Sequence, residues 1–251
     1  MTRRRLSLLF LFGFLSAIFL APGLWAQAQA QAQPPAPEFK PAVIEQPMAD
    51  LALPLYQGGE LALSSLKGKN VVIIVPRFWA DVGYYCTICD YQYMDVVSAD
   101  ETGQFRQKHN AEIVFLFPFG KEDVGKWLAT LPAQLEKIKV GKNPPDLTKL
   151  DEKGKTRMER WRKLFPKDFS LKPDAIPTPF PIMLDADRKV TKPLGVFSTD
   201  WNGAKVEQGI PSVFILNAKG VLMFKYISQN TVDRPSVEYL GKVLDMINAW
   251  K

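Results

Sequence analysis

A run of five β-branched residues at positions 71–75, Val-Val-Ile-Ile-Val, constrains the fold more than any other feature of the sequence. An unbroken apolar run of this length is typical of a strand buried on both faces in the middle of a sheet. After Cys89, apolar residues recur three to four positions apart, as on one side of a helix, and residues 112–117 form a second run of the buried type. A strand, a helix and a strand in this order predict a parallel crossover unit.

Further elements are expected on both sides of this unit. Residues 61–66 predict a short strand or turn, and residues 121–131 predict a helix. The second half of the chain predicts a strand at 180–184, a short helix at 185–195, a hairpin of strands 212–216 and 221–227, and a closing amphipathic helix at 235–250 with Pro235 in its first turn. This order predicts the α/β class with a mixed sheet.

The first residues predict an export signal at 1–28, because three arginines precede an apolar run at 6–20 and the small residues Ala26 and Ala28 follow. If the signal is not cleaved, the apolar run would anchor the chain in a membrane. Residues 29–45, rich in Ala, Gln and Pro, predict a flexible linker, and residues 46–251 predict one domain. We therefore expect an exported protein, periplasmic in the first place and otherwise secreted or signal-anchored.

The charge of the chain is unevenly distributed. It carries 32 Lys and Arg against 26 Asp and Glu, and removing the three arginines of the signal leaves 29 against 26, which is no signature of nucleic-acid binding. Basic residues gather in an insertion at about 132–178, where positions 137–172 hold 12 Lys and Arg against 5 Asp and Glu. We expect a solvated, partly helical insertion whose apolar stripe packs on the domain through Met158, Trp161, Leu164 and Phe165. The alternative is a docking surface for an acidic partner or for anionic lipid headgroups.

Cys86 and Cys89 are the only cysteines, and three kinds of site are open to them. A structural disulfide between them would close a very small loop and would therefore remove little entropy from the unfolded chain. A metal would need more ligands, and the single histidine, His109, is expected on the surface, so neither a metal nor a cofactor is expected. The favoured interpretation is redox chemistry through a reversible Cys86–Cys89 disulfide.

This dithiol is expected between a buried strand and a helix. Cys86 would then lie at the helix N-terminus, where unpaired N–H groups and the helix dipole favour its thiolate and make it the attacking sulfur. Cys89, one turn further along and more buried, would resolve the mixed disulfide. Tyr84 and Tyr85 are expected to form an apolar rim on which a substrate polypeptide rests.

Three stretches resemble the thioredoxin superfamily, and within it the peroxiredoxin-like (redoxin) group called alkyl hydroperoxide reductase C/thiol-specific antioxidant: residues 78–80 ahead of the dithiol, residues 180–197, and residues 212–237. The resemblance implies a thioredoxin-like fold, with a central mixed sheet flanked by helices and with the basic insertion added. It also implies that Pro211 is cis and lies against the dithiol, leaving the backbone of Ile210 free to pair with a bound peptide. A trans proline that opens an edge strand is the alternative.

The chain departs from the peroxiredoxin pattern at three positions. The resemblance places Gly83 where peroxiredoxins have a threonine or serine and Trp79 where they have a proline, and the stretch 208–211 lacks the expected arginine. These departures favour thiol–disulfide exchange with thiol- or disulfide-containing proteins or a thiol reductant, carried out by Cys86 and Cys89. The alternatives are a thiol peroxidase, with Cys86 peroxidatic and Cys89 resolving, and a non-catalytic binding module with a thioredoxin fold.

Overall fold

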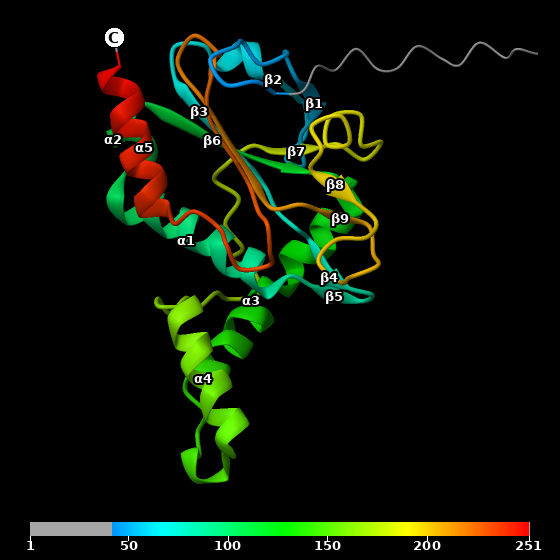
Figure 1. The fold of residues 1–251 in the computed structure, drawn as a ribbon, viewed down its shortest axis with the longest axis vertical. Helices are drawn as coiled ribbons and strands as arrows, with labels where there is room; N and C mark the ends of the chain where they lie inside the picture. The colour runs from blue at the N-terminus through cyan, green and yellow to red at the C-terminus, as the bar shows by residue number, and fades with distance from the viewer. Residues whose placement is uncertain (1–41, 251) are drawn as a thin grey trace, which may run out of the picture. The chain divides into compact units, whose positions relative to one another are not determined.

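A five-stranded mixed sheet forms the centre of the fold in the computed structural model, which describes residues 42–250 (Figure 1). The strands lie in the order β11-β10-β3-β6-β7. Their bounds are Asn70–Val75 for β3, Ala111–Phe117 for β6, Ile182–Leu184 for β7, Ser212–Leu216 for β10 and Leu222–Ile227 for β11. The predicted signal at 1–28 and residues 29–41 of the predicted linker lie outside the described residues.

The predicted crossover unit is confirmed. Strand β3 is buried at every position and pairs in parallel with β6, with Val72 opposite Ile113. Helices α1 (Thr87–Gly103) and α2 (Phe105–Lys108) connect the two strands. Gln104 separates the helices because its left-handed backbone, with φ of 51°, ends α1. Since β3 lies between β10 and β6 in the sheet, the chain that leads to the dithiol leaves a strand that is paired on both sides.

The other strands of the sheet also agree with the sequence. Strands β10 and β11 form the predicted antiparallel hairpin, and β10 pairs antiparallel with β3 on the other side. Strand β7 pairs in parallel with β6 at the edge of the sheet. Three two-stranded pairs surround the sheet: β1 (Ala52–Pro54) with β2 (Glu60–Ala62), β4 (Trp79–Asp81) with β5 (Tyr84–Tyr85), and β8 (Phe197–Ser198) with β9 (Gln208–Gly209). A 3₁₀ turn, η1 (Leu63–Leu66), follows β2, as expected for a short strand or turn at 61–66.

Alternating side chains of β3 give the sheet two separate cores. Val72 and Ile74 face the core built with α1, α3 (Lys121–Lys142) and α5 (Val237–Ala249). Figure 1 shows α1 and α5 on the same side of the sheet. Val71, Ile73 and Val75 face a second core, which is closed by η1 and by the turns that end near Val196. The sheet is therefore covered on both faces, which is why a strand as apolar as β3 can lie at its centre.

The basic insertion is built from the C-terminal part of α3, the 3₁₀ turn η2 (Leu147–Lys149) and helix α4 (Glu152–Leu164). Helix α3 continues through Pro132 and is longer than the sequence predicted. Helix α4 packs beside the C-terminal end of α3 (Figure 1). Most of the predicted apolar stripe packs on the domain: Phe165 is buried in the core and Trp161 and Leu164 are half-buried against it, whereas Met158 is buried outside that core.

Three local predictions were wrong. Residues 185–195 form turns and not a helix, because the Asp185 carboxylate accepts hydrogen bonds from the backbone N–H groups of Val190 and Thr191. Pro235 precedes α5 and is not in its first turn, since Ser236 is the N-cap. His109 is buried and not on the surface, with its Nδ1 at 2.8 Å from Asp245 Oδ1. Among residues 42–250, no helix is long and apolar enough to cross a membrane.

Candidate active site

The dithiol begins helix α1. Cys86 is the N-cap residue, and its backbone N–H donates to the Phe78 carbonyl at 2.8 Å. The Cys86 carbonyl in turn accepts from the N–H groups of Cys89, at 2.8 Å, and Asp90, at 3.2 Å. Both cysteines are free thiols, and they are only 3% and 2% exposed. The predicted placement of Cys86 at a helix N-terminus is confirmed, but Cys86 is as buried as Cys89.

The segment between β3 and the dithiol contains a short hairpin that is rich in aromatic residues. Phe78 is fully buried with a φ of 71°, and its ring stacks on Phe119 at 4.1 Å. The residues that separate it from Cys86 form the β4–β5 pair, which turns at Gly83 with a φ of 73°. Glycine adopts this left-handed conformation without strain, whereas a threonine or serine at this position would be strained. The hairpin therefore accounts for the missing hydroxyl at position 83.

Arg234 contacts both sulfurs. Its Nη2 lies 3.5 Å from Cys86 Sγ and 3.5 Å from Cys89 Sγ, while its Nη1 donates to the Thr231 carbonyl at 2.7 Å. The arginine lies two residues before Ser236, the N-cap of α5. A cation just before a helix N-terminus gains nothing from the positive end of the helix dipole. The two sulfurs are therefore the main electrostatic partners of the Arg234 guanidinium.

A second arginine, Arg77, also contacts Cys89. Its backbone N–H donates to Cys89 Sγ at 3.2 Å. Its buried guanidinium donates through Nε to Gln208 Oε1 at 2.8 Å and through Nη2 to the Ala80 carbonyl at 3.0 Å. Gln208 is itself held by the carbonyls of residues 204 and 206. The stretch 208–211 thus contributes a residue that positions Arg77.

These neighbours make the two thiols unequal. Burial alone would raise the pKa of the Cys86 thiol, but the hydrogen bond with Cys89 and the positive charge of Arg234 outweigh it and lower the pKa from 9.0 to about 6. Burial raises the pKa of Cys89 well above its ordinary value, and the hydrogen bond and negative charge of Cys86 raise it further. At neutral pH the pair therefore holds one thiolate, on Cys86, and one proton, on Cys89.

Asp90 adds a buried carboxyl directly after Cys89. Its Oδ1 accepts a hydrogen bond from Trp127 Nε1 at 2.6 Å, and its Oδ2 has no hydrogen-bond partner among the described residues. Burial raises the pKa of Asp90 well above its ordinary value, and the negative charge of Cys86 raises it further. A carboxyl in this environment favours the protonated form at a higher pH than a surface aspartate does.

The predicted substrate-binding residues Ile210 and Pro211 differ from expectation. Residues 42–250 contain no cis peptide bond, so Pro211 is trans. The Ile210 backbone is not free, because its N–H donates to the Val196 carbonyl at 2.8 Å and its carbonyl accepts from Ser212 Oγ at 2.8 Å. A peptide cannot pair with this backbone while these internal hydrogen bonds persist.

The two tyrosines of the predicted rim lie in different environments. Tyr84 is exposed at the tip of the β4–β5 hairpin, as is Val82. Tyr85 is half-buried and stacks on Trp79 with ring centroids 4.2 Å apart, so it supports the hairpin. Of the predicted rim, Tyr84 has a side chain that is open to a partner.

Sequence reasoning missed Arg234, Arg77 and Asp90. Arg234 is 145 residues from Cys89 along the chain. A basic residue just before a helix N-terminus is nevertheless unfavourable by itself and is a usable signal. Arg77 follows an entirely apolar strand, where a charged residue needs a specific partner. Asp90 lies in α1 between Cys89 and Tyr91, which are both buried, so its carboxyl is buried with them.

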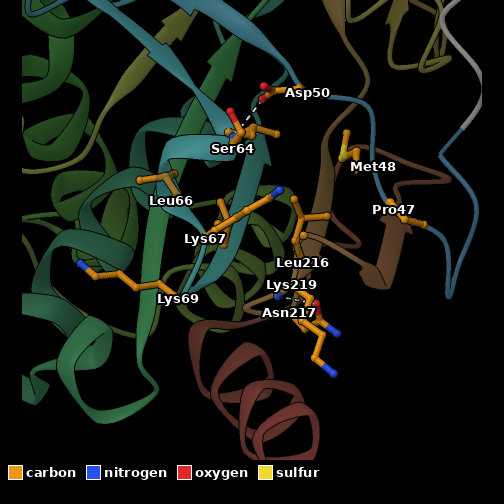
Figure 2. Close-up of a pocket in the computed structure, with 13 residues that line it drawn as sticks. Pro47, Met48, Asp50, Ser64, Leu66, Lys67, Lys69, Leu216, Asn217 and Lys219 are labelled. Atoms are coloured by element: carbon orange, nitrogen blue, oxygen red, sulfur yellow. Dashed lines mark hydrogen bonds between the residues drawn. The ribbon is translucent and has the colours of Figure 1, made fainter.

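A separate hollow lies at the opposite end of the sheet (Figure 2). It has a volume of about 190 Å³, and Val71, at the start of β3, and Leu216, at the end of β10, both line it. Asp50 and Ser64 are hydrogen-bonded to each other at its wall. The hollow contains no cysteine, and the described residues form no cluster of three or more His, Cys, Asp and Glu side chains able to hold a metal. The dithiol is therefore the chemically distinctive site of the domain.

Solved structures with a similar fold are peroxiredoxins. A cysteine-to-serine mutant of peroxiredoxin 6 from Arenicola marina is 14% identical with a TM-score of 0.51, over 83% of this chain and 76% of the other. The reduced 2-Cys peroxiredoxin of Plasmodium vivax is 13% identical with a TM-score of 0.49, over 83% of each chain. Peroxidoxin BcpB of Mycobacterium tuberculosis is 14% identical with a TM-score of 0.44, over 84% of this chain and 99% of the other.

The sequence itself gives the closer assignment. No curated protein matches the chain. The AhpC/TSA family profile matches residues 44–225, which include the dithiol and the whole sheet up to most of β11. The thioredoxin-like fold predicted from the sequence and the paired cysteines at the start of α1 agree with that match, and the chain belongs to the AhpC/TSA family.

Proposed function

We propose that this redoxin-family thiol protein is a thiol–disulfide oxidoreductase that exchanges its Cys86–Cys89 pair with partner proteins. The observation that carries the proposal is the inequality of the two thiols around one arginine. Cys86, with its pKa lowered to about 6, is ready to attack, whereas Cys89, with its pKa raised, keeps its proton until it is needed. Arg234 lies equally close to both sulfurs.

The exchange proceeds in two balanced displacements. The Cys86 thiolate attacks one sulfur of a partner disulfide, the partner's S–S bond breaks, and the second partner sulfur leaves as a thiolate. Cys89 then loses its proton and attacks Cys86 Sγ, which releases the first partner sulfur. The partner disulfide has gained two electrons, its two thiolates take up the proton lost by Cys89 and one proton from water, and the Cys86–Cys89 pair has become a disulfide. A thiol reductant reverses the sequence and restores the dithiol.

Arg234 serves both displacements because the negative charge moves between the sulfurs that it contacts. In the first step its guanidinium stabilises the Cys86 thiolate. Once Cys86 is part of a mixed disulfide it carries no charge, and the same guanidinium then favours ionisation of Cys89. The raised pKa of Cys89, which depends in part on the Cys86 thiolate, falls when that thiolate is consumed.

Trapping tests the exchange function. The Cys89→Ala protein lacks the resolving thiol, so we expect mixed disulfides to accumulate on Cys86 and to be released by a thiol reductant. The matched Cys86→Ala protein should trap little, because Cys89 is 2% exposed and its burial still raises the pKa of its thiol. If Cys89→Ala forms no mixed disulfides with any disulfide-bonded protein, exchange is rejected.

A thiol peroxidase is a second candidate function, and the contact of Arg234 with Cys86 favours it. In this reaction the Cys86 thiolate attacks a peroxide oxygen, the O–O bond breaks, and water or an alcohol leaves. The resulting sulfenic acid condenses with the Cys89 thiol, a second water leaves, and the disulfide forms. Stopped-flow measurement of hydrogen peroxide consumption decides the matter, since a rate no greater than that of a free thiol at the same pH rejects the peroxidase.

We further propose that the protein acts outside the cytoplasm. The support is the pattern of three arginines, an apolar run and small residues at 1–28. Cell fractionation should recover the protein in the periplasm or the medium, with a mass reduced by cleavage after about residue 28. Recovery of the full-length chain in the cytosol would contradict the proposal.

A further inference from the structure

A cleft of about 700 Å³ opens beside the dithiol. Thr87 and Ile88, the two residues between the cysteines, form one wall of the cleft. Val232, two residues before Arg234, also lines it. Helix α4 of the basic insertion forms the opposite wall. Whatever occupies this cleft is in contact with the active-site dipeptide.

The floor of the cleft is apolar. Trp161 and Leu164 of α4 are half-buried there, and Phe165 beneath them is buried against Tyr91 of α1, with ring centroids 5.1 Å apart. Ile88 is also half-buried and completes the apolar surface. An occupant with apolar side chains would therefore cover surface that is now partly open to water.

The α4 wall carries three exposed cations, Lys153, Arg157 and Arg160. Among the described residues none of the three forms an ion pair or a side-chain hydrogen bond. The one acidic residue of the cleft, Glu152, already pairs with Lys155 at 2.8 Å. The cleft thus presents uncompensated positive charge next to the dithiol.

The three cations form a row. At positions 153, 157 and 160 they are spaced four and three residues apart and so lie on one side of α4. With a rise of about 1.5 Å per residue the row is about 10 Å long, which is more than one carboxylate or phosphate group can contact. A polypeptide segment with several acidic side chains matches this length, and its apolar side chains match the recessed floor, which a flat lipid surface would not reach.

We propose that this cleft docks an acidic, partly apolar segment of the partner protein whose disulfide or dithiol reacts at Cys86. The proposal rests on the exchange function given above and adds the kind of partner. The α4 row binds the acidic side chains, the floor takes an apolar side chain, and the Thr87–Ile88 wall brings the partner's sulfur to Cys86. The basic insertion is then the specificity element of the enzyme.

Synthetic peptide disulfides test the docking. Each peptide carries one cysteine linked to a nitrobenzoate thiol and one leucine, in an acidic version with four glutamates and a neutral version with four glutamines. Cys86 attacks the peptide sulfur, the S–S bond breaks, and the nitrobenzoate leaves as a coloured thiolate. We expect the reduced protein to react about three to ten times faster with the acidic peptide, and high salt to remove the difference.

Two double variants locate the preference. In R157Q/R160Q, which keeps only Lys153 of the row, the ratio of the two rates should fall towards one. The matched variant K149Q/K172Q removes two exposed charges of the insertion that do not line the cleft, and it should keep the ratio. Equal rates in the wild type, or an unchanged ratio in R157Q/R160Q, would overturn the docking proposal.

The same assay separates docking from exchange. If neither peptide reacts through Cys86, the proposed exchange function fails, whereas reaction of both at equal rates leaves exchange intact and removes only the docking. Vesicles of phosphatidylglycerol cover the other source of negative charge. If R157Q/R160Q abolishes vesicle binding without changing the peptide ratio, the row is a lipid site and the proposal is overturned.

Discussion

Replacing Arg234 with glutamine should raise the pKa of Cys86 and slow its reactions at neutral pH. Glutamine approximates the length of the arginine stem but removes the charge that lies 3.5 Å from both sulfurs. In the intact site the pKa of Cys86 is about 6, compared with an ordinary value of 9.0. The variant therefore tests how much of that difference comes from one side chain.

The size of the effect follows from the position of the charge. With a pKa of about 6, about 90% of Cys86 is thiolate at pH 7. An opposite charge within ~4–6 Å lowers a pKa by about 1 to 3, so loss of Arg234 should reduce the thiolate to between about half and about 1% of the molecules. The alkylation rate at pH 7 should fall between about twofold and about ninetyfold.

Iodoacetamide alkylation over a range of pH measures this directly, with the modified Cys86 peptide identified by mass spectrometry. Arg234→Lys keeps a positive charge but loses the planar guanidinium, so its rate at pH 7 should lie between those of the wild type and Arg234→Gln. Arg162→Gln removes a charge from α4, where Arg162 donates to the Lys142 carbonyl, and should leave the alkylation profile unchanged.

The reasoning fails if folded Arg234→Gln has the same alkylation midpoint as the wild type. Circular dichroism and urea unfolding confirm that the variant is folded before its rates are compared. A midpoint that moves equally in Arg162→Gln would also refute the argument, because the effect would then come from net charge and not from contact with sulfur.

Two further predictions concern residues around the site. Because the pKa of Asp90 is raised, the folded state binds the Asp90 proton more tightly than the unfolded state does. In urea unfolding, the stability of the wild type should therefore fall relative to Asp90→Asn as pH rises above about 4, by at most ~1.4 kcal/mol per pH unit. Parallel pH profiles of the two proteins would contradict this. Gly209→Ala would place a Cβ against the Pro76 carbonyl oxygen and should destabilise the fold by about 1–3 kcal/mol. Gly103→Ala, with open space around the new Cβ, should not destabilise it. Equal urea midpoints for the two variants would refute the close approach at Gly209.

The sequence was most informative where local pattern decides structure. The run at 71–75 is buried on both faces and lies in the centre of the sheet, as five β-branched residues in succession predict. The placement of Cys86 at a helix N-terminus also followed from the pattern after Cys89. Both depend on residues close together in the chain.

The parts that sequence could not supply depend on contacts between distant residues. Arg234 reaches the sulfurs from the entry to α5, and His109 is buried because Asp245 of that same helix lies beside it. The Ile210 N–H donates to the Val196 carbonyl, so the hydrogen bonding of the Ile210 backbone depends on how the neighbouring β8–β9 pair folds. Apart from the unfavourable position of Arg234 just before a helix N-terminus, these pairings leave no periodic or compositional trace.

The place of the insertion in the chain has a consequence for the order of folding. All of α3 and α4 lie between β6 and β7, so these two parallel strands can pair only when a long connection closes. Loop closure becomes costlier by only about 0.6 kcal/mol for each doubling of length, which makes such an insertion thermodynamically cheap. The kinetic effect is larger, because the β10–β11 hairpin and the shorter β3–β6 crossover close first. Strand β7 should therefore pair with β6 only after the shorter β3–β6 crossover, which contains the dithiol, has formed.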